Sequence, residues 1–377
     1  MSTALVFGAN GVSGLALLNA LTSKPSSEWK KIIAVSRRPA VLEHNDDRVE
    51  FVSVDLLSSH EELVEKLKKA GAEETTHVAF YAYVAKQDET ELIEVNCKLF
   101  SNSLEAIAQA CPNVRAVLLQ TGYKYYGVHK GGKYLASLPF KEDAPRHPGD
   151  NFYFVQEDML KDAAKKHGWG WIVNRPNFIL GATKGNFMSL ATTVALYGSA
   201  RKTLNEPLVF PGSSVSYNLL YDHSTASHNA EFQLYALQKP EAYNRTFNIH
   251  DGRAVSWAEL WPKIADYFGV PLPSPLADDL PSDKTAGEDV AMVHSASEWA
   301  SQHSSDFDFL VQSHGLQEDS FKYATWDFLD FTTSRTWEDR GSLDEARSIG
   351  WTKDVDSFEE GFKLVFEQLK KLKVIPA

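Results

Sequence analysis

Cysteine is scarce in this sequence, and long hydrophobic runs are missing. The two cysteines, Cys97 and Cys111, cannot form a disulfide framework or, by count alone, a zinc site. No apolar run reaches the length of about 18 residues that a membrane-spanning helix needs, and no secretory leader precedes the first apolar segment at residues 4–7. We therefore expect a soluble, unprocessed protein of the reducing cytoplasm.

Positive charge is in short supply as well. The 38 lysines and arginines are outnumbered by 50 aspartates and glutamates, which gives a formal net charge of −12. Without a net basic field, neither nucleic acid nor an anionic membrane is an expected partner. Metal-ligand patterns are also lacking: His223 and His228 lie off one helical face with no carboxylate pattern around them, so we expect no metal site.

What the sequence does contain is an alternation of short apolar strands with helices. Strands are predicted at residues 4–7, 31–35, 49–54, 77–84, 116–120 and 171–174. Helices are predicted between them at residues 15–21, after the capping box of Ser59 and Glu62, at 89–110 and at 154–167. This rhythm is typical of an α/β fold, a Rossmann-type doubly wound parallel sheet that binds ligands at the C-terminal ends of its strands.

The length of 377 residues exceeds the usual size of one domain. We expect a dinucleotide-binding domain at residues 1–180 and a smaller, mostly substrate-binding lobe at 181–377, with segments around 213–250 returning to the first domain. The regular rhythm ends after residue 180. The later predictions are a helix at 187–197, a strand and turn at 208–212, a short strand at 247–249, a helix capped by Ser256 and Glu259, an irregular stretch at 273–306 and a last helix at 357–372.

A glycine-rich turn, GANGVSG at residues 8–14, follows the first predicted strand. Glycines let the backbone bend tightly and approach a pyrophosphate closely, while the N–H groups of the next helix point at it. The pattern therefore predicts a dinucleotide site. The residues that we expect to contact the cofactor here are Gly8, Asn10, Gly11, Val12 and Gly14. The alternative is a tight turn that holds no ligand.

The second predicted strand ends in Ser36, Arg37 and Arg38. An NAD site would place an aspartate or glutamate here to accept from the ribose 2′-hydroxyl, whereas guanidinium groups match a 2′-phosphate. This favours NADP over NAD, with an exposed basic pair on a surface turn as the alternative. The third strand ends in Asp55 and Leu56, where the aspartate could accept from the adenine amino group.

Two further segments offer the acid and the cation that a nicotinamide-dependent reductase needs. They are TGYKYYG at residues 121–127 and NFYF at residues 151–154. Hydride transfer to a carbonyl or an enone leaves negative charge on oxygen, which a tyrosine can stabilise if a nearby cation offsets its ordinary pKa of about 10. The lysine usually stands four residues after the tyrosine, where this chain has Glu157.

The motifs resemble those of the progesterone 5β-reductase and iridoid synthase-like enzymes, within the extended short-chain dehydrogenase/reductases. Those enzymes share Gln-Thr-Gly-x-Lys-x-Tyr, matched at residues 120–126, and Asn-Phe-Tyr-Tyr-x-x-Glu-Asp, matched at residues 151–158 with Phe154 replacing the second tyrosine. The likeness covers nearly the whole chain and includes VSRRP at 35–39, NCKLF at 96–100, FPG at 210–212, FNI at 247–249 and KVIP at 373–376.

The resemblance implies that Tyr153 hydrogen-bonds the substrate carbonyl, that Lys124 assists it, and that NADPH delivers hydride to the β-carbon of an enone. The serine that assists the tyrosine in many extended reductases falls on Gly122. Further residues implied to contact the cofactor are Tyr81, Thr121, Gly122, Tyr153, Pro176 and Ile179, and residues implied to line the substrate pocket are Tyr83, Tyr126 and Phe187. Reaction type transfers across a family better than substrate identity does.

Other interpretations stay open at this point. Tyr153 could be a packed aromatic residue and Lys124 an exposed loop lysine. If both act, 1,2-reduction of a ketone or imine competes with 1,4-reduction, because only the pose of the substrate decides which carbon faces the hydride. A non-catalytic NADP-sensing protein is a further alternative, since the usual serine and lysine are missing. The resemblance is also compatible with a homodimer.

Overall fold

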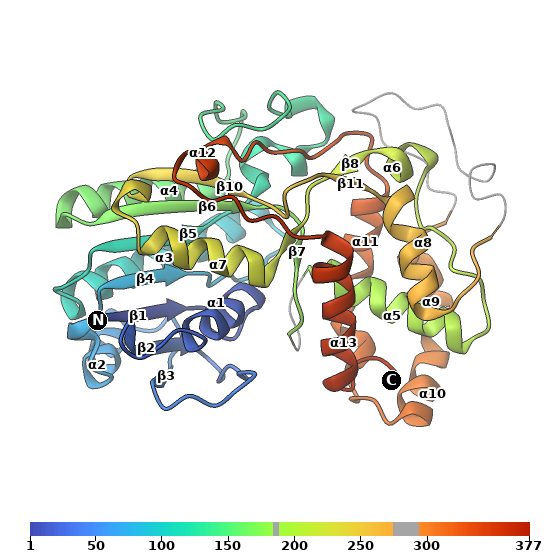
Figure 1. The fold of residues 1–377 in the computed structure, drawn as a ribbon, viewed down its shortest axis with the longest axis horizontal. Helices are drawn as coiled ribbons and strands as arrows, with labels where there is room; N and C mark the ends of the chain where they lie inside the picture. Colours follow the sequence, from blue (N-terminus) through green and yellow to red (C-terminus); the bar gives the residue numbers. More distant parts are fainter. Residues whose placement is uncertain (184–187, 274–293) are drawn as a thin grey trace.

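The computed structural model describes residues 1–183, 188–273 and 294–377. Its centre is a parallel sheet of seven strands in the order β10-β6-β5-β4-β1-β2-β3 (Figure 1). The strands are β1 (Ser2–Phe7), β2 (Trp29–Ser36), β3 (Val49–Ser53), β4 (His77–Phe80), β5 (Ala116–Gln120), β6 (Gly170–Pro176) and β10 (Arg245–Ile249). The strand order reverses between β1 and β4, and the predicted α/β doubly wound parallel sheet is confirmed.

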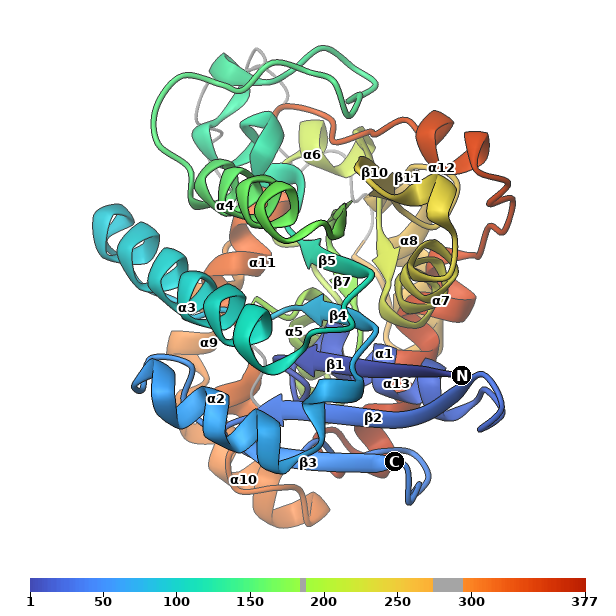
Figure 2. The same cartoon turned by 90° about the vertical axis from the view of Figure 1, so that its left-hand side faces the viewer.

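Helices cover both faces of this sheet. They are α1 (Val12–Thr22), α2 (His60–Lys69), α3 (Glu89–Ala110), α4 (Phe152–His167) and α7 (Ala226–Leu237). Helices α1 and α7 pack against each other on one face, and α2, α3 and α4 lie side by side on the other (Figure 2). In β1, Leu5 and Phe7 join the apolar cluster beneath α2, α3 and α4, whereas Ala4 and Val6 join the cluster beneath α1 and α7. Successive residues of this buried strand therefore point to opposite faces of the sheet and pack against the helices on each face.

Strand β4 is shorter than predicted. The sequence predicts a strand at 77–84, but β4 ends at Phe80. The side-chain amide of Asn96, on α3, accepts from the Val84 N–H at 2.9 Å and donates to the Val84 carbonyl at 2.9 Å. Because a helix side chain satisfies the backbone there, the segment after Phe80 does not need a neighbouring strand.

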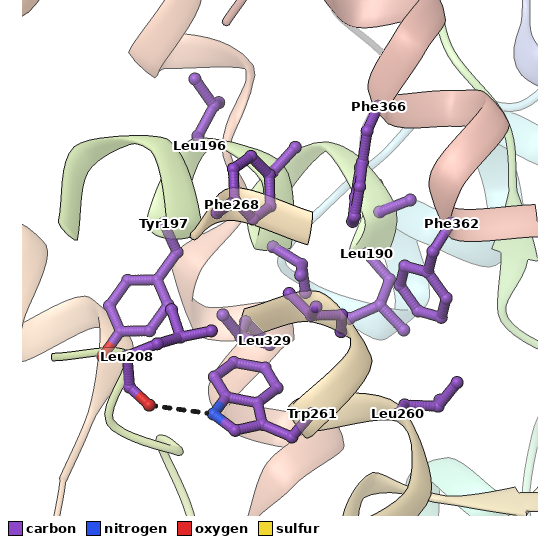
Figure 3. Packing of buried hydrophobic residues seen from close by; sticks show 14 of the residues in the cluster. Leu190, Leu196, Tyr197, Leu208, Leu260, Trp261, Phe268, Leu329, Phe362 and Phe366 are labelled. Atoms are coloured by element: carbon purple, nitrogen blue, oxygen red, sulfur yellow. Dashed lines mark hydrogen bonds between the residues drawn. The ribbon is translucent and has the colours of Figure 1, made fainter. Parts of the chain in front are cut away.

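A group of helices lies beyond the carboxyl ends of the strands and shares one apolar cluster (Figures 1 and 3). They are α5 (Leu190–Thr203), α6 (Ser214–Asn218), α8 (Trp257–Phe268), α9 (Ala296–Gln302), α10 (Ser304–His314), α11 (Trp326–Thr333) and α13 (Lys363–Lys371), which follows a π-helical turn at Ser357–Phe362. Helix α12 (Asp344–Ser348) contacts β10 instead. Two small sheets pair β7 (Ile179–Leu180) with β9 (Ser224–Thr225) and β8 (Leu220–Tyr221) with β11 (Val255–Ser256).

The strand predicted at the start of residues 208–212 is not formed. The Leu208 N–H donates to the Pro271 carbonyl at 2.8 Å, and the Leu208 carbonyl accepts from the Trp261 indole at 3.1 Å (Figure 3). A loop and a helix side chain therefore replace the strand partner. By contrast, the helix predicted after Ser256 is present as α8, with the Ser256 hydroxyl accepting from the Glu259 N–H.

The prediction of an irregular stretch at 273–306 is wrong for its last part, where α9 and the start of α10 lie. The carboxylate of Asp330, on α11, accepts from the N–H groups of Ala296 and Ser297 at 2.6 and 3.0 Å and so caps α9 from a distant part of the chain. The helix predicted at 187–197 is α5, which begins at Leu190; its predicted first residue, Phe187, lies outside the described residues.

Two segments from residues 213–250 lie at the sheet: α7 packs on α1, and β10 pairs with β6. The division of the chain near residue 180 into two domains stays a prediction. In the ranges that the structure describes, no helix has both the length and the apolar character needed to cross a membrane.

A buried ion pair ties α4 to β6. The Arg175 guanidinium donates to both carboxylate oxygens of Glu157 at 2.9–3.1 Å, and the two side chains are 2% and 1% exposed. The guanidinium carbon also lies 3.3 Å from the centroid of the Tyr125 ring. Because neither charge reaches water, each depends on the other for compensation.

Glu157→Gln is expected to lower the free energy of unfolding by about 3–5 kcal/mol, because it leaves a buried guanidinium without a counter-charge. Urea denaturation followed by circular dichroism measures the change. Asp158→Asn is the matched control: Asp158 is the next residue and also binds an arginine through both oxygens, Arg146 at 2.6 and 2.8 Å, but on the surface. Its cost should stay below about 1 kcal/mol. Equal losses in the two variants would contradict the role given to the buried pair.

Candidate active site

A cavity lies where β1, β4, β5 and β6 end, and its wall continues into the group of helices beyond the sheet. The wall comprises residues 11–13, 80–83, 120–124, 128–129, 152–153 and 176–179, together with Gln156, Met188, Phe328, Phe331 and Arg335. Strand ends next to a reversal of strand order are where doubly wound sheets bind their ligands. The cavity therefore stands where the sequence predicts a cofactor and a substrate to meet.

Gly8 and Gly14 of the glycine-rich turn have no room for a side chain. Gly8 has a φ of +77°, and a Cβ on Gly14 would stand 2.2 Å from the Gly8 carbonyl oxygen. Helix α1 begins at Val12, and its N-cap residue, Gly11, offers no side chain to the first N–H groups. These N–H groups, which the helix itself cannot satisfy, are free to bind a pyrophosphate, with Asn10 in the same turn.

The basic pair after β2 is also free. The Ser36 hydroxyl donates to the Arg38 carbonyl at 2.7 Å and so shapes the turn. The side chains of Arg37 and Arg38 are exposed, and neither guanidinium bonds another residue that the structure describes. After β3, Asp55 is exposed and Leu56 is buried. The residues present therefore fit a phosphate on the ribose at this edge of the site.

Tyr153 and Lys124 both line the cavity. Tyr153 is the second residue of α4, and Lys124 stands in a 3-10 turn at Tyr123–Tyr126, directly after β5. The Tyr153 hydroxyl lies beside the backbone of Gly122, where an added Cβ would be 3.6 Å from its oxygen. Within the described ranges, neither the phenol nor the ammonium has a hydrogen-bond or ion-pair partner. The structure brings the two predicted groups to one wall with their polar ends unengaged.

Burial shifts both groups toward their neutral forms. It raises the pKa of the Tyr153 phenol, with a smaller contribution from Tyr83, and it lowers the pKa of the Lys124 ammonium, which the Glu89 carboxylate partly opposes. Negative charge that develops on a substrate oxygen in this cavity would meet two donors with little competition from water. The pair is therefore suited to stabilise an oxyanion.

The two departures from the usual reductase pattern have structural reasons. Glu157, at the position of the usual lysine, is engaged by Arg175 and is not part of the cavity wall. At Gly122, the position of the usual serine, a Cβ would stand 3.1 Å from the Pro176 carbonyl oxygen, so a serine would require the backbone to move. Lys124 instead lines the cavity from the 3-10 turn that follows β5.

The remaining predicted residues are divided between the cavity and the interior. Tyr81, Tyr83, Thr121, Gly122, Pro176 and Ile179 line the cavity, although the Tyr81 hydroxyl itself donates to Gln233 on α7. Tyr126 does not reach the wall: its ring is 1% exposed, and its hydroxyl donates to Asn248 at 2.6 Å. Its predicted place in the substrate pocket is therefore corrected to an interior one, because a buried hydroxyl needs a protein partner. Phe187 is not among the described residues.

Sequence reasoning missed several residues of the wall. His129 stands close to Lys124, and burial, reinforced by that charge, lowers the pKa of His129 to about 3, so the ring is neutral. Phe328, Phe331 and Arg335 come from α11 and the residues after it, and no local motif marks them. Among the side chains that the structure describes, no three of the His, Cys, Asp or Glu type gather as they would around a metal ion.

Comparisons with known proteins match this layout. The family model for the PRISE-like Rossmann-fold domain matches residues 4–376. The chain is 32% identical to the short chain dehydrogenase gsfE of Penicillium aethiopicum over 99% of both chains, and 34% identical to the 3-oxo-Delta(4,5)-steroid 5-beta-reductase of Arabidopsis thaliana over 71% of this chain and 70% of that one.

Among solved structures, the Bordetella bronchiseptica enzyme WbmG in complex with NAD and UDP aligns over 99% of this chain and 96% of its own, with a TM-score of 0.64 and 14% identity. At that identity the likeness shows the fold alone. The resemblance found in the sequence is confirmed, and the chain belongs to the family of PRISE-like Rossmann-fold proteins.

Proposed function

We propose that this protein is an NADPH-dependent reductase of α,β-unsaturated carbonyl compounds. The observation that carries the proposal is the pair of Tyr153 and Lys124: both residues line one cavity, and neither the phenol nor the ammonium has a partner among the described residues. The same wall begins at the glycine-rich turn after β1. The name of the Arabidopsis relative, a 3-oxo-Delta(4,5)-steroid 5-beta-reductase, describes the reduction of a conjugated ketone and supports the proposal.

NADP(H) is the cofactor that this chain fits best. Gly8, Gly11 and Gly14 leave the backbone open for a pyrophosphate, and the guanidinium groups of Arg37 and Arg38 stand free where NAD sites carry a carboxylate. When bound, the dinucleotide supplies the hydride. The remaining chemistry belongs to the side chains of the cavity.

In the proposed reaction, the Tyr153 hydroxyl donates a hydrogen bond to the carbonyl oxygen of the substrate. As hydride adds to the β-carbon, the electron pair of the double bond moves toward the carbonyl and an enolate forms. Tyr153 and the Lys124 ammonium stabilise the negative oxygen, and a proton taken up at the α-carbon completes the saturated product. The two donors bind the enolate more strongly than the neutral substrate, which is the condition for acceleration.

Apart from Tyr153, eight aromatic residues line the cavity, with polar side chains such as Gln120, Gln156 and Arg335 among them. The aromatic residues are Phe80, Tyr81, Tyr83, Tyr123, Phe152, Phe178, Phe328 and Phe331. Such a wall excludes water from the reacting atoms and binds an apolar molecule that carries few polar groups. We therefore expect an enone with an apolar body as the substrate class.

Tyr153→Phe should lower kcat for enone reduction by about 100-fold or more, because it removes the donor to the developing oxyanion. Lys124→Met should lower kcat by about tenfold or more. NADPH consumption is followed by absorbance with a panel of cyclic and linear enones. Tyr217→Phe is the matched control, since the Tyr217 ring packs on Phe210 and is not part of the cavity wall. Turnover that survives Tyr153→Phe unchanged, or is absent with every enone, would contradict the proposal.

The double variant Arg37→Ala/Arg38→Ala should raise the KM for NADPH by about tenfold or more, because the 2′-phosphate loses its counter-charges. The KM for NADH, which lacks that phosphate, should change little and is the internal control. Steady-state kinetics with the two cofactors measures both values. A wild-type enzyme that prefers NADH, or a variant in which both KM values rise equally, would rule out this role for the two arginines.

A further inference from the structure

Asn151 connects the two proposed catalytic residues through a single side-chain amide. Its oxygen accepts from the backbone N–H of Tyr153 at 3.0 Å and caps the start of α4. Its nitrogen donates to the backbone carbonyl of Lys124 at 2.9 Å. The side chain is buried, with 4% of the residue exposed. One amide group thus spans from the helix that carries the phenol to the turn that carries the ammonium.

His147 fixes the orientation of this amide. The His147 Nδ1 lies 2.8 Å from the Pro148 carbonyl, which can only accept, so Nδ1 carries the proton and Nε2 is an acceptor. Nε2 lies 3.1 Å from the Asn151 nitrogen and therefore takes its second N–H. A rotated amide would set its oxygen against two acceptors, the Lys124 carbonyl and His147 Nε2. All hydrogen-bonding capacity of the amide nitrogen is used.

A helix cap alone would not need these bonds. Capping uses only the side-chain oxygen, and serine or aspartate serves that purpose as well as asparagine does. The amide nitrogen makes its two bonds away from α4, to Lys124 and His147. The Asn151 amide thus binds the Lys124 carbonyl and the Tyr153 N–H at the same time.

We propose that Asn151, held by His147, is the positioning residue that sets the Lys124 ammonium relative to the Tyr153 phenol. This inference rests on the proposed function, because it assigns the task of Asn151 within that reaction. Without the Asn151 link, the Lys124 carbonyl keeps its bond from the Gly127 N–H at 3.2 Å, and Tyr125 keeps its contact with Phe154, but Lys124 itself is no longer bonded to the N-cap of α4. The Lys124 ammonium would then be held less firmly relative to the Tyr153 phenol, and misplacement by about 1 Å is enough to slow an enzyme about 100-fold.

Asn151→Ser tests the proposal, because it keeps the cap of α4 and removes the link to Lys124. We expect kcat for an enone that the wild type reduces to fall by about tenfold or more. The dissociation constant of NADPH, measured by fluorescence, should change less than about threefold, since serine keeps the cap on the Tyr153 N–H and the predicted pyrophosphate and ribose contacts, at residues 8–14 and 36–38, lie elsewhere. Asn151→Asp, a near-isosteric cap, should lose kcat in the same way, because it sets an oxygen against the Lys124 carbonyl.

A double-variant cycle separates positioning from a general structural effect. In the background of Lys124→Met, Asn151→Ser should lower kcat by less than about twofold, because the group it positions is already absent. Ser59→Ala is the control for a lost helix cap, since the Ser59 hydroxyl caps α2, away from the cavity. It should lower the melting temperature and leave kcat unchanged. Additive losses in the cycle, or an Asn151→Ser enzyme with wild-type kcat, would overturn the proposal.

The outcome is distinguishable from a failure of the proposed function. Where the wild type reduces enones and Asn151→Ser does so equally well, only the positioning role is wrong. Where the wild type reduces none, a crystal structure of Asn151→Ser decides the geometric claim. We expect the Lys124 carbonyl to have moved away from the start of α4, and an unchanged turn would contradict it.

Discussion

The geometry of the site depends on the contacts that the Arg175 side chain makes. Its guanidinium binds Glu157 on α4, stacks on the Tyr125 ring and reaches the Tyr126 hydroxyl at 3.2 Å, so it touches both the helix and the turn that frame the cavity. It stands at the end of β6, directly before Pro176, whose carbonyl faces Gly122. Removing water from so many charged and polar groups is unfavourable unless each has a partner. The interior therefore fixes one arrangement of β6, α4 and the turn after β5.

The candidate site lies at the edge of this network of hydrogen-bonded side chains. Tyr123 donates to the Asp222 carboxylate at 3.0 Å, and Tyr126 donates to Asn248. In the part of the chain that the structure describes, the Tyr153 phenol and the Lys124 ammonium have no such partner. Both residues are partly exposed and line the cavity, so their polar groups are available to a ligand there. Because the neighbouring tyrosines are fixed by their own hydrogen bonds, the phenol and the ammonium stay accessible to a substrate oxygen.

Local patterns are enough to predict the sheet and the glycine-rich turn, because each depends on residues that are close in sequence. The roles of Tyr153 and Lys124 come from the family resemblance and stay predictions, although the structure places both residues on one cavity wall. The features that sequence reasoning missed depend on distant partners. Helix α9 has a local cap at Ser295, but Asp330 on α11 also binds its first N–H groups, and the backbone after β4 is bonded by Asn96 on α3. Tyr126 is predicted to line the substrate pocket, but Tyr123, from the same 3-10 turn, lines the cavity instead. Arg335 enters the cavity from a segment that no motif marks.

The central claim is that hydride reaches the carbon β to a carbonyl whose oxygen is bound by Tyr153 and Lys124. Its most direct test is reduction of a simple cyclic enone with NADPH deuterated on the transferring face, with the product analysed by nuclear magnetic resonance. The expected product is a saturated ketone with deuterium at the β-carbon. Deuterium at the carbonyl carbon, with the double bond intact, would show 1,2-reduction and contradict it.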